Sequence, residues 1–320
     1  MGNLVEPTGK KAAATTGRRF LLIGGIVLAG ILVALLAWWW SGSRWVHIGP
    51  LQWGADSAPI SYQLVFNRPD EPGPTELRTK YDLEQLVASA SDDTAKLVAL
   101  TGWAHTRWKH NGSNQPSNPD PLTILKEASQ GKRFRCVEYG EVITGAAQAL
   151  GMPARVLGIK TSDAATRRVG AGHVVSEVWL ADRGKWAFAD GQFGYVPMLN
   201  GVPLNAVEFQ WAIATADPGL TLASAEGPVV DKARLYYLKW VSPYLYYFDF
   251  VYDQRQFKDG AAGTSTGSTA PGTTGSNVTA NRLELVPKGA PNLTVFQRTM
   301  TFSATYTSDP AVFYRPPEGH

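Results

Sequence analysis

The apolar residues of this chain follow a helical period in its first half and a strand period further on. From residue 83 to 108 they recur at spacings of three, four or their multiples, which predicts a helix with one apolar face. A shorter helix is predicted over 122–130. A third begins close to Cys136 and ends just before Gly151, because glycine suits a helix C-cap and a proline follows two residues later.

Strand patterns follow these helices. Residues 155–159, 174–180 and 186–189 have the composition of strands, and the last two flank a turn sequence, D-R-G at 182–184, which predicts a hairpin. Helices followed by a run of antiparallel strands are typical of an α+β fold. The predicted fold class is therefore α+β.

Composition divides the chain into six segments. They are a basic tail (1–19), an apolar stretch (20–40), a spacer (41–82), a main domain (83–257), a Gly/Ser/Thr-rich linker (258–281) and a small C-terminal β segment (282–320). Within the spacer, residues 60–66 have a strand-like pattern. The linker is compatible with two roles, a loop inside one domain or a tether to another.

Residues 235–257 are dense in aromatic side chains. Such a segment serves either as a substrate surface or, more often, for packing within the protein. Both interpretations stay open at the level of sequence.

The apolar stretch 20–40 contains no charged side chain. About 20 such residues, at a helical rise of ~1.5 Å each, cross a hydrocarbon layer of ~30 Å, so a transmembrane helix is predicted. The basic tail before it predicts a cytoplasmic N-terminus, with the rest of the chain outside. Three tryptophans at 38–40 suit the interface between bilayer and water at the non-cytoplasmic end of this helix.

A cleaved signal peptide is the alternative for this stretch. The apolar region of a signal peptide is typically ~7–15 residues long and precedes small residues, whereas this stretch is longer and ends in bulky tryptophans. We therefore expect an uncleaved, single-pass anchor that contacts the lipid bilayer through residues 20–40, with the main domain extracytoplasmic.

Charge and cysteine content exclude several classes of site. Lys and Arg exceed Asp and Glu by three, and the first nineteen residues already account for that excess. The rest is balanced, whereas a nucleic-acid groove needs a concentrated basic surface, so no nucleic-acid partner is predicted. The single cysteine excludes an intrachain disulfide and a cysteine-rich zinc site. No metal or cofactor is predicted.

The only cysteine opens the third predicted helix, and a histidine and an aspartate follow on two predicted strands. Cys136, His173 and Asp190 stand in the order that a nucleophile, a base and an orienting acid need. A thiol reacts as thiolate, which a helix N-terminus and an imidazolium stabilise. His173 would exchange protons with thiol and leaving amine, and Asp190 would orient the imidazole. Each residue taken singly also fits a structural role, but together they predict a catalytic triad.

At these residues the chain resembles a known family. Residues 131–158, with the form G-x4-C-x-E-Y-x9-A-L-G-M-P-A-R-V-L-G, resemble the core of the transglutaminase-like superfamily. The sequences G-H-V-V-S-E-V-W-L and G-K-W-A-F-A-D resemble its histidine and aspartate strands. The resemblance implies a papain-like core, in which the helix bearing Cys136 packs on an antiparallel sheet and His173 and Asp190 complete the triad.

Two positions depart from the family pattern. Many relatives carry an aromatic residue two positions after the histidine, where this chain has Val175, and a proline after the aspartate, where it has Gly191. Neither position supplies reacting atoms, so the departures concern pocket shape and substrate. Nothing resembles the added β-sandwich domains or calcium sites of animal transglutaminases, so calcium dependence is not implied.

Donors for a developing oxyanion are the less defined part of the site. Backbone N–H groups at the start of the Cys136 helix are one source. Gln130 lies six residues before the cysteine, the spacing of the oxyanion glutamine in papain-like proteases, and Trp103 or Trp108 would offer an indole N–H. All three also fit ordinary structural roles.

The leading functional hypothesis is a membrane-anchored cysteine acyltransferase, peptidase or amidase that forms an acyl intermediate on Cys136. Its expected substrate is a peptide, protein or cell-envelope amide. Hydrolysis is favoured over transfer to an amine, because transfer needs a dry, shaped acceptor site. The alternative is a non-catalytic scaffold or binding module of the cell envelope, against which the complete set of three residues argues.

Overall fold

The computed structural model describes residues 2, 30–32, 49–56, 59–258 and 281–318. The chain divides into two units, Met1–Val46 and His47–His320. The predicted transmembrane segment lies outside the described residues except for 30–32, which are helical. Across the residues that are described, no helix has the length and apolar character needed to span a membrane.

Helices form most of the first half of the second unit. The helices are α2 (Pro72–Lys80), α3 (Leu83–Val87), α4 (Asp93–His105), α5 (Pro121–Ser129), α6 (Cys136–Ala149), α7 (Ala206–Ala214), α8 (Asp231–Val241) and α9 (Pro310–Phe313), with a 3₁₀ turn η1 (Ser242–Tyr244). The helices predicted over 122–130 and from Cys136 onward are confirmed as α5 and α6. Gly151, just beyond α6, has a φ of +77°, a left-handed conformation that glycine adopts readily at a helix end.

The single helix predicted over 83–108 is in fact two helices. An extended residue, Asp92, with φ of −153° and ψ of 176°, separates α3 from α4. Its carboxylate accepts a hydrogen bond from the backbone N–H of Ala95 at 2.8 Å and so caps α4. The apolar spacing continues across the break because both helices pack into one core cluster, through Leu83 and Leu97.

Among the described residues, the strands form one main sheet and two small ones. The strands are β1 (Ala154–Lys160), β2 (Gly172–Leu180), β3 (Lys185–Ala189), β4 (Val196–Leu199), β5 (Val202–Pro203), β6 (Leu220–Ala223), β7 (Tyr247–Val251), β8 (Arg282–Leu285), β9 (Val295–Phe296), β10 (Met300–Thr301) and β11 (Thr305–Thr307). The main sheet has the order β11-β8-β7-β1-β2-β3 and is antiparallel except between β8 and β11. The three predicted strands are confirmed as β1, β2 and β3.

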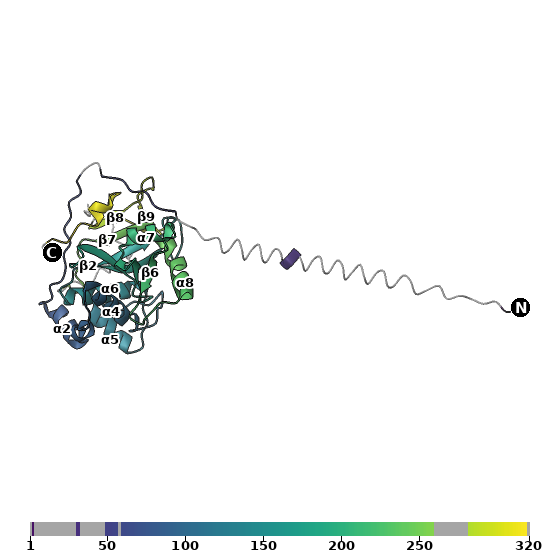
Figure 1. Ribbon diagram of the computed structural model, residues 1–320. Coiled ribbons are helices and arrows are strands. Elements are labelled where there is room, and N and C mark those ends of the chain that lie inside the picture. Colours follow the sequence, from purple (N-terminus) through teal and green to yellow (C-terminus); the bar gives the residue numbers. More distant parts are fainter. Residues whose placement is uncertain (1, 3–29, 33–48, 57–58, 259–280, 319–320) are drawn as a thin grey trace. The chain divides into compact units, whose positions relative to one another are not determined.

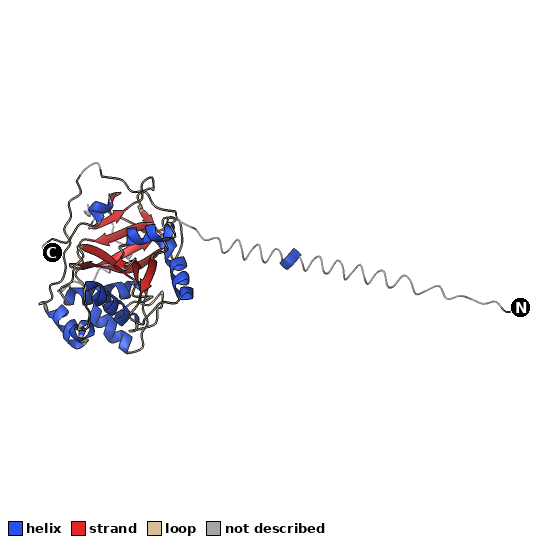
Figure 2. Cartoon of the chain, in the orientation of Figure 1, coloured by secondary structure: helices blue, strands red, loops and turns tan. Residues whose placement is uncertain are grey.

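The main sheet packs against helices on both faces. Figures 1 and 2 show α2, α4, α5 and α6 gathered below it, with α8 to its right. Side chains of a strand alternate between the faces, so Ala187 and Ala189 join the core with α2–α6 while Phe188 joins the core with α7 and α8. On the first of these faces α6 packs closely against β2 and β1. A Cβ on Gly140 of α6 would lie only 3.2 Å from the Val175 carbonyl oxygen.

The residues after the linker complete the main sheet. β8 pairs with β7, placing Arg282 opposite Val251, and β11 pairs with β8. The linker, most of which lies outside the described residues, therefore connects two adjacent strands of one sheet. Residues 282–320 contain the strands β8 to β11, of which β8 and β11 belong to the main sheet. A strand pattern in the sequence shows that a strand exists but not which strand it pairs with.

Residues 60–66 do not form the predicted strand. Within this stretch Val65 makes an isolated β-bridge with Asp253. Tyr62 stacks on Tyr252 with ring centroids 5.5 Å apart, and its hydroxyl donates to the carbonyl oxygen of Val312 at 2.8 Å. The alternating pattern therefore reflects the packing of individual side chains rather than a continuous ladder.

A buried hydroxyl ties α6 to β2. Ser176 Oγ donates to the carbonyl oxygen of Gly140 at 2.9 Å and accepts from Thr144 Oγ1 at 3.3 Å. We expect Ser176→Ala to lower the free energy of unfolding by about 1–2 kcal/mol, because both buried partners lose a bond. Urea unfolding measures this. Ser129→Ala removes an exposed hydroxyl bound within α5 and should change the value by less than ~0.5 kcal/mol. Equal losses in the two variants would contradict the prediction.

Candidate active site

Cys136 is the first residue of α6, and its side chain is partly exposed. The first N–H groups of a helix have no partner within it, and the helix dipole makes this end partly positive. In the same turn the Glu138 carboxylate accepts hydrogen bonds from the Arg135 backbone N–H at 2.9 Å and guanidinium at 2.6 Å. This pairing fixes the start of the helix and hence the position of Cys136.

His173 and Asp190 come from neighbouring strands, at the start of β2 and directly after β3. They are 3% and 0% exposed, and Nε2 of His173 lies 2.9 Å from Oδ2 of Asp190. Cys136 lies close enough to the same imidazole to help raise its pKa. Because Asp190 occupies Nε2, Nδ1 is the ring nitrogen left for the sulfur. The structure therefore brings the three predicted side chains together.

The surroundings of His173 favour its protonated form. Burial works against a charged imidazole, but the negative charge and hydrogen bond of Asp190, with a contribution from Cys136, outweigh it and raise the pKa of His173 to about 10. The imidazole is then a cation at neutral pH. A cation beside a thiol stabilises the thiolate, which is the reactive form.

The Asp190 carboxylate accepts four hydrogen bonds. Oδ2 binds His173 and the hydroxyl of Tyr237, the latter at 3.0 Å. Oδ1 accepts the backbone N–H groups of Gln192 and Phe193 at 3.0 and 3.3 Å. Buried polar atoms are normally satisfied in this way, so the protein itself fixes the orientation of this carboxylate.

Aromatic side chains cover the imidazole. The Trp240 ring meets His173 edge to face, with centroids 4.8 Å apart and an interplanar angle of 87°, and Tyr244 lies 6.0 Å away. Burial raises the pKa of Tyr244, and the nearby Cys136 adds to this, so the Tyr244 hydroxyl stays protonated at neutral pH. Phe193 packs on Trp240 at 4.7 Å. Aromatic side chains therefore cover the imidazole that binds Asp190.

The three candidate oxyanion donors lie in different surroundings. Trp108 stacks on Tyr139 of α6 at 4.2 Å, and its buried Nε1 has no acceptor within the described part of the chain. Trp103 packs against Tyr81, with centroids 5.9 Å apart. Gln130 is exposed at the end of α5. Of the three candidates, Trp108 is therefore the one whose side-chain donor is buried and without a partner among the described residues.

Both departures from the family pattern lie in tight packing. A Cβ on Gly191 would lie 2.7 Å from Ile143 Cδ1 and 2.9 Å from Tyr139 Cβ, so a proline has no room there. Val175 is buried in the same core cluster as Phe188. These residues fit the packing of this chain and leave the meeting of Cys136, His173 and Asp190 intact.

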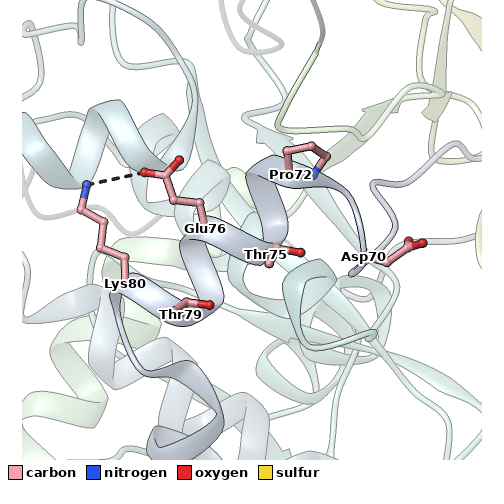
Figure 3. A pocket seen from close by; sticks show the side chains of 6 residues that line it. All are labelled: Asp70, Pro72, Thr75, Glu76, Thr79 and Lys80. Atoms are coloured by element: carbon pink, nitrogen blue, oxygen red, sulfur yellow. Dashed lines mark ion pairs between the residues drawn. The ribbon is translucent and has the colours of Figure 1, made fainter.

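An open hollow on the surface lies apart from these residues (Figure 3). It runs along α2, where Glu76 and Lys80 form an ion pair at 3.8 Å. Its lining residues are Asp70, Pro72, Thr75, Glu76, Thr79 and Lys80. The hollow shares no side chain with the Cys136 network, so it does not mark the site of chemistry. Nowhere in the described ranges do three or more His, Cys, Asp or Glu side chains form a group that could hold a metal ion.

Comparison with known proteins places part of the chain in a family. Residues 82–191 match the model of the transglutaminase-like superfamily. No curated protein matches the chain. A structure from Cytophaga hutchinsonii, provisionally named a cysteine protease, is 15% identical over 37% of this chain and 37% of its own, with a TM-score of 0.31. Red sea bream transglutaminase is 13% identical over 45% of this chain and 30% of its own, with a TM-score of 0.28. A structure named a TGase is 18% identical over 37% and 31%, also with a TM-score of 0.28.

The chain therefore contains a transglutaminase-like superfamily domain, which the family match places over residues 82–191. This superfamily includes cysteine proteases and transglutaminases, and some of its members are not catalytic. The chain spans about a third of the length of the solved structures that it resembles. At TM-scores below 0.5, these likenesses identify no activity.

Four aromatic residues of the site, Phe193, Tyr237, Trp240 and Tyr244, lie beyond the matched segment. Tyr237, Trp240 and Tyr244 belong to the aromatic stretch 235–257, for which packing was the commoner of two interpretations. Tyr237 and Trp240 lie three positions apart in α8, a spacing that places side chains on one helical face, whereas Tyr244 is in the 3₁₀ turn η1 that follows. This spacing is the sequence signal from which the shared location of Tyr237 and Trp240 could have been inferred.

Proposed function

We propose that this protein is a membrane-anchored thiol enzyme that cleaves an amide bond through an acyl intermediate on Cys136, with water as the preferred acceptor. The observation that carries the proposal is the chain of contacts from Cys136 to His173 to Asp190 at the N-terminus of α6. In this proposal residues 20–40 anchor the chain and the domain acts outside the cytoplasm. The substrate is a peptide, a protein or a cell-envelope amide.

Acylation starts from a thiolate on Cys136 and an imidazolium on His173. The sulfur attacks the carbonyl carbon and forms a C–S bond, while the carbonyl electron pair moves onto oxygen. Nδ1 of His173 gives its proton to the amide nitrogen, the C–N bond breaks and the amine leaves. The neutral imidazole keeps its Nε2 proton, which stays bound to Asp190.

Water completes the cycle. Nδ1 of His173 removes a proton from a water molecule, the water oxygen attacks the thioester carbon, and the C–S bond breaks to release the acid. The thiolate and imidazolium are thereby restored. The partial exposure of Cys136 supports water as acceptor, since transfer to an amine requires exclusion of water.

The negative charge that develops on the substrate oxygen needs hydrogen-bond donors. In this proposal the Cys136 backbone N–H, at the N-terminus of α6, is one donor, and Trp108 Nε1 is the other. Trp108 is favoured because its buried N–H has no acceptor among the described residues, and a buried donor without a partner is unfavourable. Binding of the oxyanion would satisfy it.

Alkylation of the thiol tests the proposal without a known substrate. The rate at which iodoacetamide modifies Cys136 is measured from about pH 5 to about pH 9 in the purified full-length chain and in His173→Ala. Below pH 7 we expect the wild type to react at least ~10-fold faster than the variant, because the imidazolium stabilises the thiolate.

Lys126→Ala removes an exposed cation of the same domain and should leave the rate unchanged. Since the chain has one cysteine, Cys136→Ala gives the background. An unreactive thiol in a folded protein, indifferent to His173, would contradict the enzyme proposal and favour a non-catalytic scaffold.

A further inference from the structure

The carboxylate that orients His173 has a second side-chain partner. Tyr237 of α8 donates its hydroxyl proton to Oδ2 of Asp190 at 3.0 Å, and Nε2 of His173 lies 2.9 Å from the same oxygen. Tyr237 and Asp190 are both 0% exposed. The hydroxyl therefore binds the oxygen that takes part in the His173 contact, in a place shielded from solvent.

We propose that Tyr237 is a positioning residue of this site, whose hydroxyl holds Oδ2 of Asp190 where that oxygen orients the His173 imidazole. The proposal rests on the proposed function, because it concerns the same three side chains. It adds a fourth residue, from a helix outside the matched segment 82–191.

The division of hydrogen bonds on Asp190 supports this role. The backbone N–H groups of Gln192 and Phe193 both bind Oδ1, so they hold one carboxylate oxygen only. Tyr237 occupies one acceptor position of Oδ2 and leaves another for His173. Without the hydroxyl, a buried position on a charged oxygen stays unpaired, and the carboxylate is free to turn toward other donors.

Tyr237 is itself held in place. Its ring packs against Phe193 at 4.9 Å and Tyr195 at 5.1 Å, and Trp240, one turn further along α8, covers His173. Burial, with the neighbouring charge of Asp190, raises the pKa of Tyr237 far above its usual range, so it remains a donor. One helix thus contacts both members of the His–Asp pair.

Tyr237→Phe tests the proposal, because it removes the hydroxyl and keeps the packed ring. In the full-length protein we expect alkylation of Cys136 near pH 6 to slow about five- to tenfold. We also expect the NMR resonance of the His173 Nε2 proton to shift and broaden. A purely structural hydroxyl would lower thermal stability but leave both readouts of the folded protein unchanged, which would overturn the proposal.

Two further variants sharpen the test. Tyr236→Phe removes the hydroxyl of the adjacent residue, which is 61% exposed, and should alter neither readout. If Tyr237 acts through Asp190, adding Tyr237→Phe to Asp190→Asn changes the alkylation rate by less than about twofold. An undiminished further loss in the double variant would overturn the proposal.

Failure of this inference is distinct from failure of the proposed function. Equal alkylation rates in wild type and His173→Ala would contradict the proposed function itself. If Cys136 is alkylated rapidly, and equally so, in wild type and in Tyr237→Phe, only the positioning role of Tyr237 is contradicted. If Tyr237→Phe does not fold, the Cζ resonance of Tyr237 is compared between wild type and Asp190→Asn. A shift is expected, and an unchanged resonance would overturn the inference.

Discussion

Cys136→Ala is expected to abolish amide cleavage, with turnover falling at least ~10⁴-fold to background. The sulfur forms the acyl bond, and the chain has no second thiol to replace it. Full-length protein is incubated with a panel of activated amides and peptides. Amine release gives turnover, and intact-mass spectrometry detects the acyl group on the wild-type chain alone.

Cys136→Ser is the informative companion to the alanine variant. A serine hydroxyl needs a base to remove its proton, but Asp190 keeps His173 protonated at neutral pH, so this variant is also expected to turn over very slowly. Arg133→Ala changes an exposed residue three positions earlier and should retain activity. Full amine release by folded Cys136→Ala protein would exclude the thiol mechanism.

The elements that the sequence predicted well are those with local signals at both ends. α6 begins at a polar-to-apolar change and ends before Gly151, while β2 and β3 enclose a tight turn at Gly184, whose φ is +60°. The break at Asp92 was missed because the apolar spacing runs through it. Pairing of β8 with β7 was not predictable, because a linker of uninformative composition separates the two strands.

The candidate site also has one part that could be predicted from the sequence and another that could not. Nucleophile, base and acid are restricted to few residue types and follow one another in order, so Cys136, His173 and Asp190 were proposed from sequence. The bond between Tyr237 and Asp190 joins residues 47 positions apart and depends on how α8 packs on the sheet. No local pattern encodes such a contact, because the spacing of Tyr237 and Trp240 indicates only that they share a helical face.

The family match ends just after Asp190, before several residues that bind this carboxylate. The matched segment, 82–191, contains Cys136, His173 and Asp190. The other three donors to the Asp190 carboxylate follow it and belong to Gln192, Phe193 and Tyr237. The matched segment thus contains the side chains proposed to react, and the later part of the chain supplies the remaining bonds to Asp190.

Asp190→Asn is the second change with a large expected effect, a fall in turnover of about 10²- to 10³-fold. The amide has no charge to stabilise the imidazolium, so at neutral pH His173 no longer holds the proton that the leaving amine requires. Steady-state kinetics measure the loss. Asp182→Asn alters an exposed aspartate of the β2–β3 turn and should leave turnover unchanged.

The same variant should change how stability depends on pH. A histidine of ordinary pKa 6.5 in the unfolded chain rises to about 10 in the fold, so the folded state binds this proton more tightly. The resulting stabilisation is complete below pH 6.5 and is lost as the pH rises through about 10. We therefore expect wild type to exceed Asp190→Asn in free energy of unfolding by about 2–4 kcal/mol near pH 6, in urea titrations, and the difference to shrink toward pH 10. A difference that stays constant or grows with pH would show that the loss does not come from charge pairing with His173.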